Sequence, residues 1–160
     1  MLQKVKVISD TQLMAERFES LKAGIIGGFS LSLAFFITSL LNNLVLKLYF
    51  STLPTLEIYP VNLQFLLSAA IAGFSGLLFG VTYRYIMRTD KNPQLKAGAV
   101  LAFGLVRGLT QIQLGLDYRE PIVPYFVLAV ESILWFVIAA IALDIALQLS
   151  WLKPFKSLDK

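Results

Sequence analysis

Long apolar runs that hold almost no charge dominate the hydrophobic pattern of the chain. Four of them, over residues 23–46, 63–83, 97–116 and 124–151, reach the length of about 20 residues that a helix needs to cross a hydrocarbon core of about 30 Å. Backbone polar groups must all be bonded internally in lipid, so such runs are expected to be helices. The sequence predicts an all-α polytopic membrane protein with four transmembrane helices, in which residues 1–160 form a single membrane domain.

Short connections separate these runs, so consecutive spans are expected to be neighbours. Pro54 and Pro60 lie in the first connection, Pro93 in the second and Pro121 in the third. Proline and the polar residues around it favour turns. We therefore expect two helical hairpins, with both ends of the chain on one side of the membrane and residues 1–20 as a segment on that side.

Basic residues gather on this same side. Eleven of the fourteen Lys and Arg residues lie there: Lys4, Lys6, Arg17, Lys22, Arg84, Arg88, Lys91, Lys96, Lys153, Lys156 and Lys160. By the positive-inside rule both termini are cytoplasmic, or stromal in a thylakoid. The formal net charge of +4 is then a topology signal, and we expect no nucleic-acid partner.

Two segments on the cytoplasmic side have more than one interpretation. The basic loop between the second and third spans contains Arg84, Arg88, Lys91 and Lys96, and it either docks a partner or an anionic lipid or serves only to fix the topology. Residues 9–20 are expected to form a helix before the first span. That helix either extends the span into the cytoplasm or lies on the membrane surface and grips lipid headgroups.

Short motifs recur between the two hairpins. Leu-Lys-Ala-Gly at residues 21–24 recurs at 95–98, and Ala-Ala-Ile-Ala at 69–72 recurs at 139–142. Because each hairpin has two spans, a duplication would give a parallel repeat about an axis along the membrane normal. Apolar helices also match by chance, so duplication and coincidence both stay open.

Small residues in the spans predict where helices approach each other. Lipid is as apolar as leucine, so packing in a membrane depends on small residues and buried polar contacts. The second span has such residues at four-residue spacing: Ser68, Ala72, Gly76 and Gly80. This helix-packing face serves either packing within one bundle or an interface with a second copy or another subunit.

Two oppositely charged residues fall inside the spans. Arg107 is nine residues from Leu116, about 13 Å at a rise of about 1.5 Å per residue, and Glu131 is seven residues from Pro124, about 10 Å. Since a charge in the bilayer needs a partner, we predict a buried Arg107–Glu131 salt bridge. It would be a structural clamp, part of a transport or proton pathway, or a contact to a pigment.

Residues around Arg107 fit a polar interior. Gly104, Gly108 and Gln111 lie on the same helical face and form a small and polar stripe, and Trp135 is one turn from Glu131, where it would stack on the guanidinium. Two other polar features lie nearer the span ends. Asp144 is placed where Lys22, Arg84 or Lys96 would reach it, and Asn42 and Asn43 are expected only to snorkel toward the interface.

The chain has no cysteine and no histidine. Disulfides, cysteine-based zinc sites, histidine-ligated metals and cysteine or serine–histidine nucleophiles are therefore excluded. A phosphate-binding glycine loop and a paired-carboxylate site are also lacking in the sequence. We expect neither enzyme activity nor a cofactor or metal.

Residues 83–109 carry the only family resemblance. The stretch Tyr-Arg-Tyr-Ile-Met-Arg-Thr-Asp-Lys-Asn-Pro-Gln-Leu-Lys-Ala-Gly and the following Ala-Phe-Gly-Leu-Val-Arg-Gly-Leu resemble small multi-span membrane proteins from cyanobacteria and plant plastids that have no assigned function. The resemblance covers the central loop and the third span. It implies a thylakoid or cyanobacterial plasma membrane, and it implies no activity.

Two functions remain open on the sequence alone. The first is a non-catalytic structural, assembly or accessory subunit of a membrane complex. The alternative is a small oligomeric transporter or channel that uses Arg107 and Glu131. The expected partners are the lipid bilayer and either further copies of the chain or a larger complex.

Overall fold

The computed structural model describes residues 2–46, 63–87, 92–117 and 122–154. All regular structure in these ranges is helical: α1 (Leu2–Leu41), the π-helical turn η1 (Asn42–Leu46), α3 (Leu63–Ile86), α4 (Pro93–Asp117) and α5 (Ile122–Gln148). Within those ranges four helices are long and apolar enough to cross a membrane. The all-α fold with four membrane-spanning helices is thereby confirmed.

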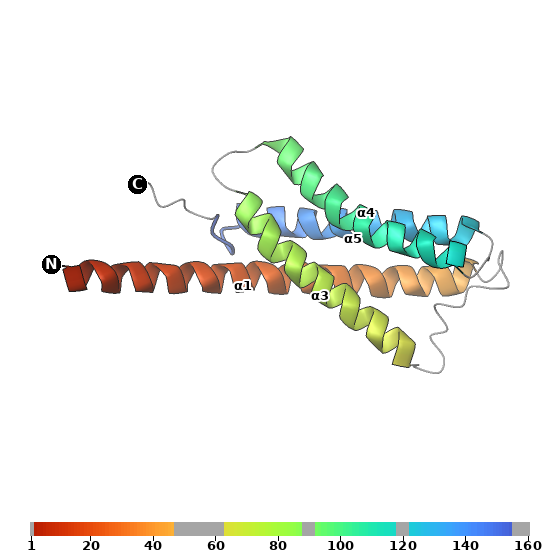
Figure 1. Cartoon of the computed structure of the whole chain (residues 1–160), viewed down its shortest axis with the longest axis horizontal. Coiled ribbons are helices and arrows are strands. Elements are labelled where there is room, and N and C mark those ends of the chain that lie inside the picture. Colours follow the sequence, from red (N-terminus) through yellow and green to blue (C-terminus); the bar gives the residue numbers. More distant parts are fainter. Residues whose placement is uncertain (1, 47–62, 88–91, 118–121, 155–160) are drawn as a thin grey trace.

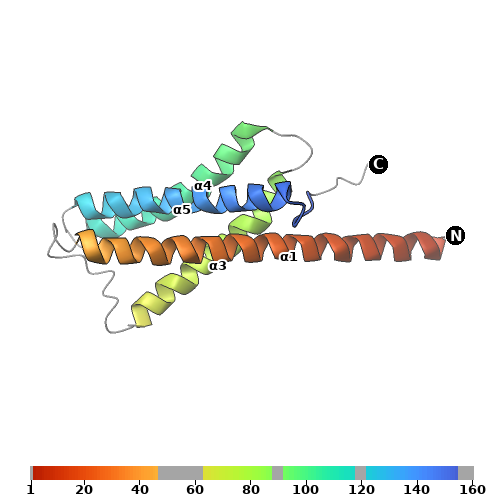
Figure 2. The ribbon, with the colours of Figure 1, turned by 180° about the vertical axis from the view of Figure 1, so that it is seen from behind.

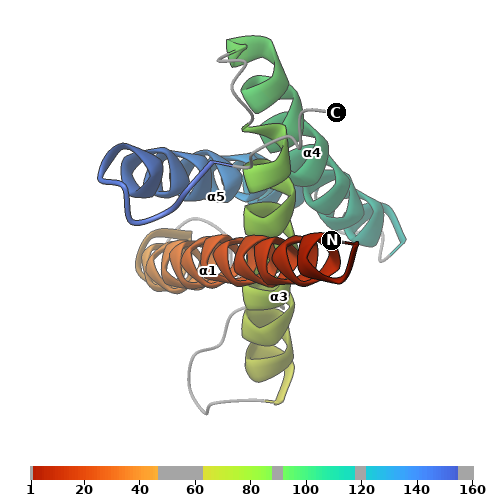
Figure 3. The ribbon, with the colours of Figure 1, turned by 90° about the vertical axis from the view of Figure 1, so that its left-hand side faces the viewer.

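The helices pair as two hairpins. The closest pairings are α1 with α3 and α4 with α5, and contacts between α1 and α5 join the two pairs. Figure 1 shows α1 and α5 side by side with opposite directions, while α3 and α4 cross them obliquely. The end-on view in Figure 3 shows the same crossing of α1 by α3. The start of α1 and the segment after α5 lie at the same end of the bundle, as two hairpins require (Figure 2).

Helix α1 is one continuous rod that is much longer than a bilayer core. It has 40 residues, or about 60 Å at a rise of about 1.5 Å per residue, against a core of about 30 Å. The N-terminal part of α1 projects beyond the other helices (Figures 1 and 2). The helix expected over residues 9–20 is therefore continuous with the first span, which agrees with an extension and differs from a separate surface-lying helix.

The α1–α3 pairing depends on glycines that let two backbones touch. A Cβ atom built on Gly76 would lie 2.6 Å from the carbonyl oxygen of Gly27, and one on Gly80 would overlap the carbonyl oxygen of Ala23. Ala72 on the same face is fully buried, and Ser68, the fourth residue of the helix-packing face, is half-buried. Gly76 and Gly80 of the helix-packing face thus pack against α1 of the same chain.

Glycines bring α4 against α5 in the same way. A Cβ atom on Gly104 would lie 2.9 Å from the Ile133 Cα atom, and one on Gly108 would lie 2.9 Å from the Ala129 carbonyl oxygen. Gly104 and Gly108 therefore face α5. Their contribution to the Arg107 region is to set how closely the two helices approach.

The recurring motifs occupy different packing positions in the two hairpins. Ala23 is fully buried, whereas its counterpart Ala97 is exposed. A Cβ atom on Gly24 would contact the Val81 side chain at 3.1 Å, whereas one on Gly98 has nothing within 4 Å. The two hairpins share a topology, but the packing of these residues gives a parallel repeat no support.

Arg84 lies inside the protein and not in a basic loop that is free to dock a partner. Its side chain is fully buried in the last turn of α3. The guanidinium forms an ion pair with Glu16, donates to the Ser20 hydroxyl at 2.6 Å and donates from Nε to the Lys153 carbonyl at 3.0 Å. Arg84 thereby ties α1 and the segment after α5 to α3, so it is not part of a docking surface.

A second ionic contact lies at the same end of the bundle. The Lys96 ammonium contacts one Asp144 carboxylate oxygen at 2.8 Å, and the Tyr83 hydroxyl donates to the other at 3.0 Å. Of the three basic residues expected to reach Asp144, Lys96 is the one that pairs with it. Two of the four residues of the predicted basic loop thus have partners inside the protein, and Arg88 and Lys91 lie outside the described residues.

Candidate functional site

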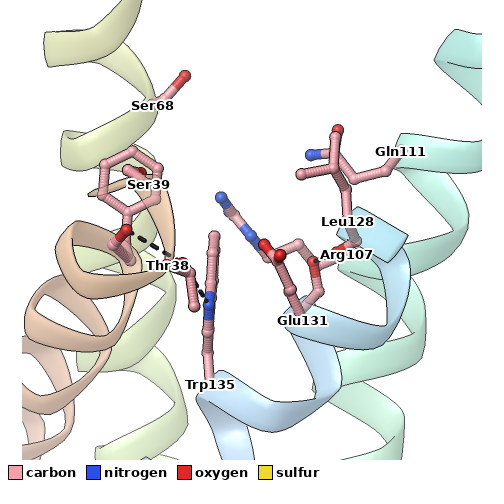
Figure 4. A pocket seen from close by; sticks show the side chains of 10 residues that line it. Thr38, Ser39, Ser68, Arg107, Gln111, Leu128, Glu131 and Trp135 are labelled. Carbon is pink, nitrogen blue, oxygen red and sulfur yellow. Dashed lines mark hydrogen bonds between the residues drawn. The ribbon is translucent and has the colours of Figure 1, made fainter. Parts of the chain in front are cut away.

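A small cavity lies where all four long helices meet. Its volume is about 50 Å³, and a water molecule needs about 10–15 Å³ of such space. Three of the residues that line it are apolar or aromatic: Phe35, Leu128 and Trp135. The other lining residues carry hydroxyl, amide or charged groups: Thr38, Ser39, Ser68, Arg107, Gln111, Glu131 and Ser132. In Figure 4, Arg107, Glu131 and Trp135 converge on this space from α4 and α5, with Ser39 and Ser68 on its other side.

The residues predicted to form a polar interior are therefore brought together only in part. Arg107, Gln111, Glu131 and Trp135 all line the cavity, which supports the estimate that Arg107 and Glu131 lie at similar depth. The Arg107 guanidinium carbon lies 4.8 Å from the centre of the Trp135 ring, so the predicted stacking is present.

The predicted Arg107–Glu131 salt bridge is not formed. The ion pairs in the described part of the chain are Lys22–Glu19, Arg84–Glu16 and Lys96–Asp144. Each of the two residues has another neighbour. Glu131 accepts a hydrogen bond from the Asn42 amide at 3.0 Å, and Arg107 spreads its guanidinium over an indole face, which attracts a cation. Both side chains reach the same cavity without pairing directly.

Several residues of the site were not predicted from the sequence: Thr38, Ser39 and Ser132 line the cavity without having been singled out, and the role predicted for Asn42 was wrong. Asn42 was expected to snorkel, yet it is buried and bonded to Glu131. It begins the π-helical turn η1, where the backbone widens after α1. Single π-helical turns often occur at functional sites, but nothing in the hydrophobic pattern predicts one. The usable signal was the polar amide itself, because polar residues within a span usually face the protein interior.

Two buried polar atoms of the cavity have no hydrogen-bond partner within the described ranges. They are the Arg107 Nε atom and the Ser39 hydroxyl, and the Ser39 side chain is only 1% exposed. Other cavity groups are satisfied, since the Ser132 hydroxyl donates to the Leu128 carbonyl at 2.9 Å and the Trp135 indole donates to Thr38 at 3.1 Å. A buried polar group without a partner costs about 1–3 kcal/mol, so the two orphaned atoms mark groups that are suited to hold a ligand.

Aromatic rings separate the cavity from the ionic residues at the end that holds the termini. Phe79 packs on Phe103 and Phe136 with ring centroids 5.4 and 5.2 Å apart, and on Tyr83 at 5.3 Å. Along α3, α4 and α5 these rings come between the cavity residues and the Lys96–Asp144 pair. The cavity therefore belongs to the half of the bundle that is distant from the termini.

Metal ligands are scarce in this arrangement. No group of three or more His, Cys, Asp or Glu residues comes together in the described segments. In the cavity, Glu131 is the single carboxylate, and Arg107 beside it repels cations.

No family model, curated protein or solved structure matches the chain. The resemblance of residues 83–109 to cyanobacterial and plastid membrane proteins thus stays a prediction.

Proposed function

We propose that this chain is a small membrane transport protein, which passes a small polar solute through the cavity around Arg107 and Glu131. One observation carries the proposal: Arg107 Nε and the Ser39 hydroxyl are buried without a partner and face the same polar cavity. In this proposal the termini are cytoplasmic, in line with the positive-inside rule.

The absence of a direct salt bridge favours transport over a structural clamp. A charged side chain near the centre of a membrane helix costs about 2.5–3.5 kcal/mol on insertion scales. A clamp would offset this cost with a close ion pair. Arg107 instead contacts an indole face and has an unpaired Nε. A charge at this position is therefore best explained by an interaction with a solute that enters the cavity.

The small-residue faces support the same proposal. Interfaces between membrane subunits need surfaces that allow close backbone approach. On α3 and α4 these surfaces are occupied by α1 and α5 of the same chain. The aromatic rings next to the cavity would form the closed barrier of the pathway, which has to open toward the cytoplasm in each transport cycle.

The proposal predicts that removing both charges preserves the fold but stops transport. We expect Arg107→Leu with Glu131→Leu to keep the helical content and to change the free energy of unfolding by no more than about 1–4 kcal/mol, in the stabilising direction, because two buried charges are replaced by apolar groups. Flux of formamide and of sodium nitrate into proteoliposomes, followed by light scattering after an osmotic step, should fall to the level of empty vesicles.

The matched control removes an ion pair outside the cavity. Lys22 and Glu19 form a contact of 2.7 Å on the cytoplasmic half of α1. Replacing both by leucine should leave the flux unchanged. Unchanged flux in the Arg107/Glu131 double variant would refute the transport proposal.

A second candidate function is that of an accessory subunit, and the extension of α1 favours it. Met14, Phe18 and Leu21 are exposed there, and they continue the helical stripe of Ile25 and Phe29 beyond the length of a bilayer core. Such a stripe suits contact with another membrane subunit. Recovery of the protein in a stoichiometric larger complex, lost on Phe18→Glu, would support this role, whereas a lone protein with flux in proteoliposomes would support transport.

A further inference from the structure

Two groups that line the cavity have no internal partner in the described ranges, and both can donate a hydrogen bond: the cationic Nε of Arg107 and the hydroxyl of Ser39. The amide of Gln111, which also lines the cavity, can donate as well. The one carboxylate, Glu131, already accepts a bond from Asn42 on one oxygen. A ligand that satisfies these donors has to be an acceptor, and a cationic donor favours one with negative charge.

The volume of the cavity limits the ligand to a few atoms. About 50 Å³ holds about three to five water molecules at about 10–15 Å³ each. Halides, nitrate and formate fit that space. The faces of Phe35 and Trp135, whose rings meet edge to face at 5.5 Å, form an apolar wall on one side. Such a wall suits weakly hydrated monovalent ions better than strongly hydrated divalent ones.

Charge balance then involves Glu131. Of the charged residues that the structure describes, Arg107 from α4 and Glu131 from α5 are the two that line the cavity. Helices α1 and α3 contribute the neutral groups Thr38, Ser39 and Ser68, and the neutral amide of Asn42 in η1 bonds to Glu131. An added anion would leave one uncompensated negative charge in a medium of low dielectric constant, where this is costly. A proton on the Glu131 oxygen that Asn42 does not use restores neutrality.

We propose that the cavity binds a small monovalent anion between Arg107 and Ser39, and that one proton binds to Glu131 together with each anion. This inference rests on the proposed transport function and specifies its substrate class. In each cycle Glu131 takes up one proton from water on one side of the membrane as the anion enters, forming an O–H bond. That bond breaks when the proton and the anion leave on the other side, and no other bond is made or broken.

The binding step is tested on the full chain in detergent with Trp135 as the reporter. Trp151 is the only other tryptophan and is 70% exposed, so Trp151→Phe leaves a single indole that contacts Arg107. Sodium bromide and sodium nitrate are titrated against sodium gluconate at constant ionic strength, between pH 5 and pH 8. We expect a saturable fluorescence change whose apparent Kd rises up to tenfold per pH unit once Glu131 loses its proton.

Three substitutions separate the roles of the residues. Arg107→Gln should weaken anion binding at least tenfold, and Ser39→Ala about fivefold, with unchanged circular dichroism. Glu131→Gln removes the titrating group, so binding should stay at its low-pH strength across the whole range. Arg17→Gln on the exposed face of α1 and Ser75→Ala on α3, whose hydroxyl donates to Ile71, are the matched controls and should bind like the parent.

The outcomes distinguish this inference from the function on which it rests. If the fluorescence changed only linearly with bromide, and equally in Ser39→Ala and the parent, the anion site would be overturned. If formamide flux nevertheless still depended on Arg107 and Glu131, the transport function would stand. Saturable binding that depends on Ser39 but is not accompanied by flux would support the anion site and overturn the transport function. Saturable binding that does not respond to pH would overturn the role of Glu131.

Discussion

Gly80→Val is expected to destroy the pairing of α1 with α3. The new side chain would overlap the backbone carbonyl of Ala23 and approach the Gly24 Cα atom. These are backbone atoms of a helix, which cannot move aside as a flexible side chain could. The loss in the free energy of unfolding should therefore be at least about 3 kcal/mol, at the upper end of what overpacking costs. Unfolding of the purified protein in mixed micelles, followed by circular dichroism, measures this loss.

Gly98→Val provides the matched control for this prediction. It makes the same chemical change at a glycine of α4, but a Cβ atom there meets nothing within 4 Å. Its effect should stay within about 0.5 kcal/mol, as for other exposed substitutions. Equal stabilities of the Gly80 and Gly98 variants would show that α1 and α3 do not pack through this face.

Arg84→Met is expected to loosen the end of the bundle that holds the termini. The substitution leaves the Glu16 carboxylate and the Lys153 carbonyl without the cation that now binds them. Removing one partner of a buried ion pair costs about 3–5 kcal/mol. We expect a loss of that size in the free energy of unfolding, together with faster amide exchange in the segment after α5, which Arg84 holds.

Two variants test the reason for that loss. Arg17→Met removes a neighbouring arginine from an exposed position of α1 and should be nearly neutral. The double variant Arg84→Met with Glu16→Met removes both charges and should recover part of the stability, because no unpaired carboxylate is left. An Arg84 variant as stable as the Arg17 variant would contradict the network.

The helices and their pairing were predictable because they follow from length, hydropathy and small-residue spacing. The position of Arg84 was not. A basic residue next to a loop normally indicates topology, and its partner Glu16 lies 68 residues earlier on a part of α1 that extends beyond the span. Only the helix crossing in space brings the two together.

The candidate site was predictable only in part: Arg107, Glu131 and the contact of Arg107 with Trp135 were expected, whereas Ser39 and the bond from Asn42 to Glu131 were not. Helix rise alone placed Arg107 and Glu131 at similar depth, and both line one cavity. Whether they pair depends on competitors within reach. Asn42 reaches Glu131 from a π-helical turn, and the rotation that such a turn adds is not encoded in any apolar period of the sequence.

The most direct test of the central claim is a crystal structure of the protein grown with sodium bromide, with diffraction recorded at the bromine absorption edge. The claim is that Arg107 and Ser39 donate hydrogen bonds to a ligand in the cavity, and that they do not bond to each other or to Glu131. We expect an anomalous peak in the cavity, about 3–3.5 Å from Arg107 Nε and from the Ser39 hydroxyl, distances in the range of long hydrogen bonds. A cavity without that peak, in which Arg107 forms a close ion pair with Glu131, would contradict the claim.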